Sequence, residues 1–511
     1  MKRLEKSESS LIAKFEWMLF GLGILYFLGQ IYLSWNQPIL DQYAFRQTQT
    51  AITTFWIAKG GHWLAYPTPV LGWPWAVPFE FPLYQWLSAG TATIFRFLTL
   101  DQAGRLVSAA FFIGCLWPAW RVTKHVSAGA SLFRISSALV LFSPLYGFWS
   151  RSFMMESAAL FFSIWFVASI YDFIEDPNRH GLLESYLAGV MAAGIKITTF
   201  VGFSFAGAII VTYVFFKNFK KINRYKQYIP YVSTAFVVAL IILSLKIWVN
   251  YSDYLKLQNP FGGILTSEAL QTWNFGTLAQ RLSHTLLHVI TVRAPNEALG
   301  TRFVAALAVF GALFFRHWRQ GIVFIALLAL YLSTFLVFTN LHLVHHYYQY
   351  ANSIFLIAAI AYVLHVYIQE RPVVIASLVM LAIVCEIFGF HRYFYGDLVG
   401  KNREMQQILA TYVREHTRPD QIIVAAGLSW SSEVPYYAER RAIMIPDKSN
   451  DSNIRRLLEN LQRSSGGYSI GAFVSCPDGA SDSSSPAYVS LFDKLTKDRR
   501  EHFVGYCAVY Q

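Results

Sequence analysis

Long apolar runs recur along most of the chain, and they constrain its fold more than any other feature. Runs of this kind, roughly 16 to 23 residues long, match transmembrane helices, whereas strands of a membrane barrel alternate over about ten residues. Only 14% of the residues are charged and 55% are hydrophobic. The sequence therefore predicts an all-α polytopic membrane bundle. The expected helical segments are 17–35, 82–99, 104–121, 134–149, 156–172, 184–216 (a helical pair), 228–250, 301–316, 320–338, 350–368 and 372–390.

Basic residues gather in short loops between these runs. The chain carries a net charge of +12, and the basic clusters lie at Arg121 and Lys124, at 217–226, and at Arg316 and Arg319. Because Lys and Arg mark cytoplasmic loops, we expect these loops and the N-terminus to be cytoplasmic and the first run to be a retained span. This placement accounts for the positive charge without nucleic acid as a partner.

The sequence leaves the number of spans open. The loop after Arg121 is cytoplasmic only if an odd number of spans separates it from the first outward segment. Two candidate spans, 82–99 and 104–121, lie between them. Either one of them is short or interfacial, or a further crossing exists. We expect roughly 11 to 13 transmembrane helices within residues 1–395, with an outward first loop over 37–81.

The composition of residues 396–511 is typical of a soluble domain. An amphipathic helix and alternating apolar segments predict a small α/β domain on the outer side of the membrane. Cys476 and Cys507 fall in this domain, where an oxidising compartment permits a disulfide, but the sequence does not decide whether they pair. Cys115 and Cys385 fall in spans. The expected strands are 421–426, 441–445, 470–476 and 504–509, with a helix at 454–463.

Several well-defined motifs are absent from the sequence. It has no glycine-rich nucleotide-phosphate loop of the Walker type, no HExxH and no Cys/His quartet at zinc spacing. This argues against a primary pump and against a cytoplasmic nucleotide-sugar enzyme. We assign no metal ligands and leave a divalent metal open as a cofactor.

The first outward segment contains a group of polar residues. It begins with DQYAFRQTQT, which places Asp41, Arg46 and Gln47 directly after a span. The stretch AYPTPVLGWPWAVPFEFPLYQW follows, with five prolines and three tryptophans around Glu80 and Tyr84. Prolines exclude a long helix and tryptophans favour the bilayer interface, so this stretch should lie on the membrane surface. The simpler interpretation of Asp41 is the N-cap of the helix that follows it.

Two further charged positions lie at or within apolar runs. RSFMME places Arg151 and Glu156 at the start of a span, and Lys196 lies within MAAGIKITTFVGF. Charges at such depth are paired or functional. For Glu156 the alternatives are an ion pair with Arg151 or compensation of the helix N-terminus. Lys196 either extends to the interface, pairs with an acid or faces a polar cavity.

Histidines and tyrosines cluster in a later outward segment, LHLVHHYYQY. His345, His346 and Tyr347 are candidate ligands for a phosphate or a sugar, and metal ligation is the alternative.

Taken in order, these motifs resemble those of the GT-C superfamily of membrane glycosyltransferases. The similarity is to the bacterial branch related to protein O-mannosyltransferases and lipid A aminoarabinose transferases. DQYAFRQTQTA is the most specific piece, and EFPLY, RSFMME, the lysine within an apolar run and HHYYQ follow in the same order. The chain has Asp41-Gln42 where protein mannosyltransferases usually have adjacent acids, and EFPLY replaces a double-proline form. The resemblance thus implies the fold and leaves the substrate open.

The resemblance also implies a reaction. Its members transfer sugar from a polyprenyl-phosphate donor with inversion, which requires a base and cations for the leaving phosphate. We predict Asp41 as the base and Glu156 as a second catalytic acid that positions the acceptor or acts on Asp41 as a neighbouring charge. Arg46, Lys196 and the His345/His346 region are the predicted phosphate ligands. The remaining predicted substrate-binding residues are Gln47, Glu80, Tyr84, Arg151 and Tyr347. The acceptor is a glycan, lipid or protein, and the expected location is the inner membrane.

Other interpretations remain at this stage. A secondary transporter or lipid flippase also explains intramembrane charges, although it needs neither the Pro/Trp-rich loop nor the terminal domain. An oligosaccharide-lipid ligase or polymerase would have a similar bundle. In the terminal domain, Trp430, Tyr436 and Arg440 either contact glycan or pack within the domain.

Overall fold

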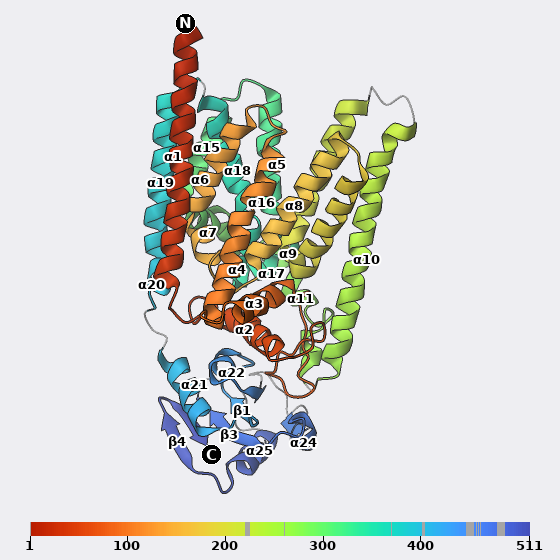
Figure 1. Ribbon diagram of the computed structural model, residues 1–511, viewed down its shortest axis with the longest axis vertical. Coiled ribbons are helices and arrows are strands. Elements are labelled where there is room, and N and C mark those ends of the chain that lie inside the picture. The colour runs from red at the N-terminus through yellow and green to blue at the C-terminus, as the bar shows by residue number, and fades with distance from the viewer. Residues whose placement is uncertain are drawn as a thin grey trace. The chain divides into compact units, whose positions relative to one another are not determined.

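The computed structural model describes residues 2–219, 225–259, 261–368, 370–400, 404–445, 454, 455, 457, 459, 461–477 and 486–511 (Figure 1). The chain divides into two compact units. The first unit, here called the bundle unit, comprises 1–37, 108–246 and 271–399. The second, the loop-and-sheet unit, comprises 38–107, 247–270 and 400–511.

The described helices confirm a mostly helical, multi-pass membrane protein. In the part of the chain that the structure describes, seven helical segments are long and apolar enough to cross a membrane. They lie in α1 (Lys2–Ser34), α4 with α5 (Leu100–Gly114, Leu116–Thr123), α8 (Glu156–Glu175), α9 (Arg179–Asn218), α10 (Ile229–Leu257), α16 (Trp318–Val337) and α19 (Pro372–Tyr393). Three shorter apolar helices are α6 (Gly129–Phe142), α15 (Arg302–Ala312) and α18 (Ser353–Ile368).

Short helices fill much of the remaining chain. One of them, α3 (Leu83–Ile94), replaces most of the span expected at 82–99, and its 12 residues cover only about 18 Å. That length is too short for the hydrocarbon core, so the expectation of a full span there is corrected. The others are α2 (Ala44–Ala58), α7 (Pro144–Trp149), η2 (Tyr225–Tyr228), η3 (Gly262–Leu265), α11 (Gln271–Phe275), α12 (Leu278–Arg281), α13 (His284–His288), η4 (Val289–Arg293), α14 (Ala294–Leu299), α17 (Thr339–Val344), η5 (His346–Ala351) and α20 (Tyr395–Leu398).

Helix α9 reverses direction at Lys196, the one residue within it that has non-helical backbone angles (φ −162°, ψ 93°). Lys217 Nζ, near the end of α9, lies 3.6 Å from Glu175 Oε1, just before its start. A straight helix would place Lys217 about 57 Å from Arg179, the first residue of α9. Phe166 of α8 also lies beside both Gly189 and Gly207, so α9 is the helical pair expected at 184–216. Figure 1 shows α8 and α9 side by side.

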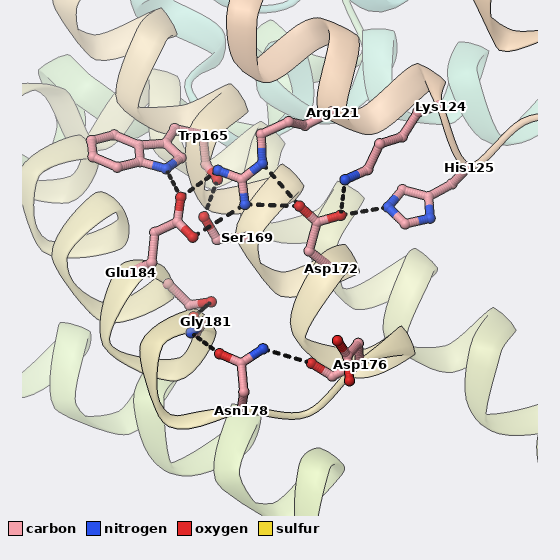
Figure 2. Close-up of polar contacts among 11 residues, drawn as sticks. Arg121, Lys124, His125, Trp165, Ser169, Asp172, Asp176, Asn178, Gly181 and Glu184 are labelled. Atoms are coloured by element: carbon pink, nitrogen blue, oxygen red, sulfur yellow. Dashed lines mark hydrogen bonds and ion pairs between the residues drawn. The ribbon is translucent and has the colours of Figure 1, made fainter.

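A charged network joins α5, α8 and α9. It lies at the end of the helical pair that contains both Arg179 and Lys217, the first residue of α9 and a residue of its last turn. Asp172 lies 2.8 Å from Arg121 and 2.9 Å from Lys124, and its other contact is His125 Nε2 at 2.6 Å (Figure 2).

The guanidinium of Arg121 also pairs with Glu184 of α9, and its Nη2 lies 3.1 Å from Glu184 Oε2. Asn178 caps α9 by accepting a 2.8 Å hydrogen bond from the Gly181 N–H, as Figure 2 also shows. These contacts fix the three helices at the end where the sequence places basic loops.

The C-terminal segment forms a five-stranded mixed sheet of order β2-β1-β3-β5-β4. Three parallel strands come first, and the antiparallel β5 and β4 follow. The expected strand at 504–509 is instead a hairpin that turns at Gly505, which has φ +61°. Cys476 and Cys507 form a disulfide. The strands are β1 (Ile422–Ala426), β2 (Arg441–Met444), β3 (Ile470–Ser475), β4 (Glu501–Val504) and β5 (Cys507–Tyr510), with α21 (Glu404–His416), α22 (Glu433–Ala438), α24 (Leu461–Ser464) and α25 (Pro486–Thr496). Part of the helix expected at 454–463 lies outside the described residues.

The first outward loop pairs with the edge of this sheet. The backbone N–H groups of Ala442 and Met444 donate to the carbonyls of Pro69 and Val70 at 2.9 and 2.8 Å. Leu71 forms a bridge with Ile443. The loop thus covers the edge strand β2, whose backbone would otherwise be open to pairing with another chain.

Candidate functional site

Helix α2 presents a buried polar face, which is unusual for a short helix. Gln47 and Gln49 are buried, as are four threonines. Each of these threonine hydroxyls donates to the carbonyl four residues earlier: Thr48 to Ala44, Thr50 to Arg46, Thr53 to Gln49 and Thr54 to Thr50. The hydroxyls are therefore satisfied within the helix, and the glutamines remain able to bind neighbouring groups.

Asp41 lies just before α2 and is 6% exposed. Gln47 Nε2 donates to Asp41 Oδ1 and, at 3.1 Å, to the Gln42 carbonyl. The N-cap of α2 is Tyr43, and no side chain caps the helix. The interpretation of Asp41 as the N-cap is therefore wrong, because the carboxylate is oriented by the amide one turn inside the helix.

Arg46 forms an ion pair with Glu80 and also donates to Gln49 Oε1. Tyr84 is fully buried, and its hydroxyl donates to the Gly104 carbonyl at 2.8 Å. The loop-and-sheet unit thus holds two polar pairs at α2, Asp41 with Gln47 and Arg46 with Glu80, here called the first polar cluster. Tyr84 instead bonds to the backbone of α4.

A second polar cluster lies in the bundle unit, around Lys196. Its ammonium pairs with Glu156, and the side chains are only 6% and 3% exposed. The same ammonium lies 4.8 Å from the ring centre of Tyr347 and 4.4 Å from that of Tyr348. An acid and two aromatic rings surround the cation. These are the kinds of partner that a buried ammonium requires. Glu156 is also the first residue of α8, where a negative charge is favourable.

The position of Lys196 differs from that expected of a lysine in the middle of a span. It occupies the reversal of α9, at the opposite end of the pair from Lys217. The first limb has 17 residues before Lys196, about 25 Å of helix. The lysine therefore lies near one rim of the bundle.

The histidines of the later segment have different environments. His346 Nδ1 lies 2.7 Å from Glu297 Oε1, and His345 stacks on Tyr347 with ring centres 5.3 Å apart. Burial lowers the pKa of His342 to about 3, and the positive charges of nearby Arg293 and Lys196 act in the same direction. Among the described residues, no group of three or more His, Cys, Asp or Glu side chains could hold a metal ion. That part of the chain gives a metal no fitting site.

Sequence reasoning missed several members of this cluster. Arg293 donates to the carbonyls of His342 and, at 3.2 Å, Leu343, and so supports the histidine segment. Glu297 lies one helical turn from it, a spacing that is visible in VRAPNEAL. The hydroxyl of Tyr350 lies 2.8 and 3.0 Å from those of Ser150 and Ser157, and burial raises its pKa.

Arg151 is completely buried, with its guanidinium 4.2 Å above the Phe148 ring. It therefore adds a cation to the interior of the bundle unit.

Two of the three candidates in the terminal domain contact other parts of the loop-and-sheet unit, and Arg440 bonds within the domain. Tyr436 donates to Asp101 at 2.5 Å, and Trp430 stacks on Phe79 at 6.1 Å. The guanidinium of Arg440 donates to Thr417 and to backbone carbonyls. These residues support packing as their role.

No family model matches this chain, and no curated protein matches it in sequence. Among solved structures, ArnT from Cupriavidus metallidurans bound to undecaprenyl phosphate matches 96% of this chain and 97% of that chain, with a TM-score of 0.62 and 11% identity. The archaeal oligosaccharyltransferase AglB from Archaeoglobus fulgidus, in complex with an inhibitory peptide and a dolichol-phosphate, matches 97% and 74%, with a TM-score of 0.52 and 11% identity. Arabinofuranosyltransferase AftD from Mycobacteria matches 97% of this chain and 40% of that chain, with a TM-score of 0.51 and 12% identity.

These likenesses show that the chain has the fold of GT-C membrane glycosyltransferases, as the motif resemblance predicted. Because the identities are only 11–12%, these structural likenesses establish the fold and no substrate.

Proposed function

We propose that this protein is an inverting glycosyltransferase that moves a sugar, a hexose or a pentose, from a polyprenyl-phosphate donor to an acceptor hydroxyl on the extracytoplasmic face. The observation that carries the proposal is the likeness over nearly the whole chain to a structure that holds undecaprenyl phosphate. The two polar clusters supply the residue types that such a reaction needs, namely an oriented carboxylate and buried cations.

In the proposed step, the acceptor oxygen attacks the anomeric carbon, and the bond from that carbon to the phosphate oxygen breaks. Asp41 takes the hydroxyl proton as general base, and Gln47 orients its carboxylate. The leaving group is polyprenyl phosphate, and Arg46 and Lys196 are the proposed cations for its charge. Arg151, His345 and His346 add donors for the phosphate, and Tyr347 is the further proposed substrate contact.

Glu156 and Glu80 each hold one of these cations in the free protein. Glu156 is also proposed to position the acceptor. A divalent metal has no role in this scheme.

The proposed orientation places the N-terminus in the cytoplasm and residues 396–511 outside the inner membrane as a separate domain. Eleven crossings satisfy it: α1, α4 with α5, α6, α8, the two limbs of α9, α10, α15, α16, α18 and α19. With α3 on the outer surface, every basic loop falls in the cytoplasm, and Asp41 and Lys196 fall on the outer side. The Cys476–Cys507 disulfide supports an oxidising location for the terminal domain.

A second candidate function is transfer of a whole oligosaccharide, by a ligase or polymerase of the same fold. The likeness to AglB, an oligosaccharyltransferase, favours it. A transporter or flippase is less well supported, because the first loop is fixed to a folded sheet by backbone hydrogen bonds, an arrangement that alternating access does not require.

The experiment that tests the proposal is transfer of radiolabelled sugar from a panel of polyprenyl-phosphate monosaccharides to membrane glycans by the purified protein in liposomes. The proposal predicts label in the glycan, one polyprenyl phosphate released for each sugar moved, and an inverted linkage. Transfer only from oligosaccharide-lipid donors would establish the second candidate instead. Movement of the intact donor across the bilayer without a new glycosidic bond would identify a flippase.

A further inference from the structure

Arg441, the first residue of β2, lies between two aromatic rings of the loop-and-sheet unit. Its guanidinium carbon is 4.0 Å from the ring centre of Trp56 and 4.7 Å from that of Tyr468. Trp56 comes from α2 and Tyr468 from the turn before β3. Contact with two rings restricts the guanidinium, and such contacts use its π face and not its N–H groups.

No side chain or carbonyl among the described residues accepts a hydrogen bond from Arg441, and no carboxylate there pairs with it. The arginine is half-buried, and burial lowers its pKa. Its neighbour in sequence shows the opposite arrangement, because Arg440 is 4% exposed and donates five hydrogen bonds within the domain. Packing of the domain therefore accounts for Arg440 and leaves the donors of Arg441 available.

Two further donors belong to the same group of side chains. Tyr468 also contacts Trp75, with ring centres 6.4 Å apart. The buried indole N–H groups of Trp56 and Trp75 have no acceptor in the part of the chain that the structure describes. Indole N–H groups usually find a partner when they are buried. This group, Trp56, Trp75, Arg441 and Tyr468, thus combines a cation and aromatic surface with two buried N–H donors beneath them.

We propose that Trp56, Trp75, Arg441 and Tyr468 form a subsite for an anionic glycan, in which the edge of the guanidinium binds a carboxylate or phosphate group on the sugar. A planar fork of N–H donors matches either oxyanion through two parallel hydrogen bonds. The half-buried rings of Trp56 and Tyr468 suit contact with the face of a sugar ring. The inference rests on the proposed function, to which it adds the class of acceptor, a negatively charged glycan.

Arginine-specific labelling tests the subsite without any transfer reaction. The full-length protein in detergent is treated with phenylglyoxal, and mass spectrometry follows modification at Arg441, at Arg440 and at the exposed Arg418. Arg441 should react faster than Arg440. Glucose 1-phosphate and glucuronate should slow its modification by about tenfold or more at saturation, whereas glucose and inorganic phosphate at equal concentration should not.

Affinity measurements on variants provide a second test of the subsite. Arg441→Lys keeps the charge but loses the fork, and it should weaken the binding of glucose 1-phosphate or glucuronate about tenfold by calorimetry. The matched control Arg418→Lys should bind as wild type does. Equal protection of Arg441 by inorganic phosphate would overturn the glycan part of the proposal. Absence of protection by every anion, or unchanged binding by Arg441→Lys, would overturn the subsite itself, even in a protein that transfers sugar.

Discussion

At the scale of single residues, the second polar cluster depends on a buried ion pair between Lys196 and Glu156. Charges of this kind remain ionised inside a protein only when each has a partner, because the loss of water costs several kcal/mol for every ion. The pair also keeps the lysine available near the rim of the bundle, where the proposed reaction needs a cation for the leaving phosphate.

Removal of one partner should therefore be costly. Lys196→Met should destabilise the protein by about 3 to 5 kcal/mol, because it leaves Glu156 buried without its cation. The double variant Lys196→Met/Glu156→Gln should regain most of that loss. Denaturant unfolding in detergent measures both effects. The matched control is Lys217→Met, which breaks the exposed pair with Glu175 and should cost less than about 1 kcal/mol. Equal losses for the two single variants would contradict this account.

The buried His342 predicts a pH dependence of stability. Its folded pKa of about 3 lies below the ordinary value of 6.5, so between these two values the unfolded chain binds a proton that the folded chain does not. This contribution to stability is intact above pH 6.5 and falls by up to about 1.4 kcal/mol per pH unit as the pH decreases toward 3. His342→Gln should flatten the dependence in unfolding measurements from pH 4 to 7. The exposed His416→Gln should keep the wild-type slope, and an identical slope for both variants would be the contrary result.

At the scale of elements, the sequence predicted the apolar helices and the helical pair well, because hydrophobic length alone determines what crosses a bilayer. It left open whether 82–99 or 104–121 is short, and the structure shows the short helix at 82–99, where Pro82 precedes the helix and the regular turns stop at Ile94. It also merged β4 and β5, since a strand hairpin of four residues on each side leaves little room for alternation.

The partners within the candidate site could not be predicted in the same way. Glu156 and Lys196 are 40 residues apart, and only the folded chain shows that they meet. Similarly, only the folded chain shows that Gln47 donates to Asp41, and its contact with substrate stays a prediction.

The disulfide makes a prediction for the sheet. It joins Cys476, after β3, to Cys507 in β5, across 31 residues. The double variant Cys476→Ser/Cys507→Ser should lower the stability of residues 404–511 by about 3 to 4 kcal/mol, because the open loop gains conformational freedom when unfolded. Protease cleavage within this segment of the full-length protein, followed in increasing urea, measures the loss. The matched control is Cys115→Ser/Cys385→Ser, which should leave this cleavage unchanged, and a loss below about 1 kcal/mol in the first variant would contradict the prediction.

At the scale of the whole molecule, the proposed orientation is open to a direct test. Alkaline phosphatase is active only outside the cytoplasm, so fusions after Phe97 and after Gly400 should be active, and a fusion after Phe219 should be inactive. The fusion after Phe97 is decisive, because it lies beyond α3 and before α4. Low activity at that position, with normal expression, would mean that α3 crosses the membrane and that eleven crossings is the wrong number.

The central claim is that Asp41 removes the acceptor proton in a sugar transfer at the outer face. The most direct measurement is the single-turnover transfer rate of Asp41→Asn in liposomes with a polyprenyl-phosphate sugar that the wild type uses. We expect a rate lower by about 10² to 10⁴ with donor binding retained, since general base catalysis contributes that much. The exposed carboxylate of Asp420 provides the control, and Asp420→Asn should keep the wild-type rate. A wild-type rate for folded Asp41→Asn would contradict the claim and would show that another group accepts the proton.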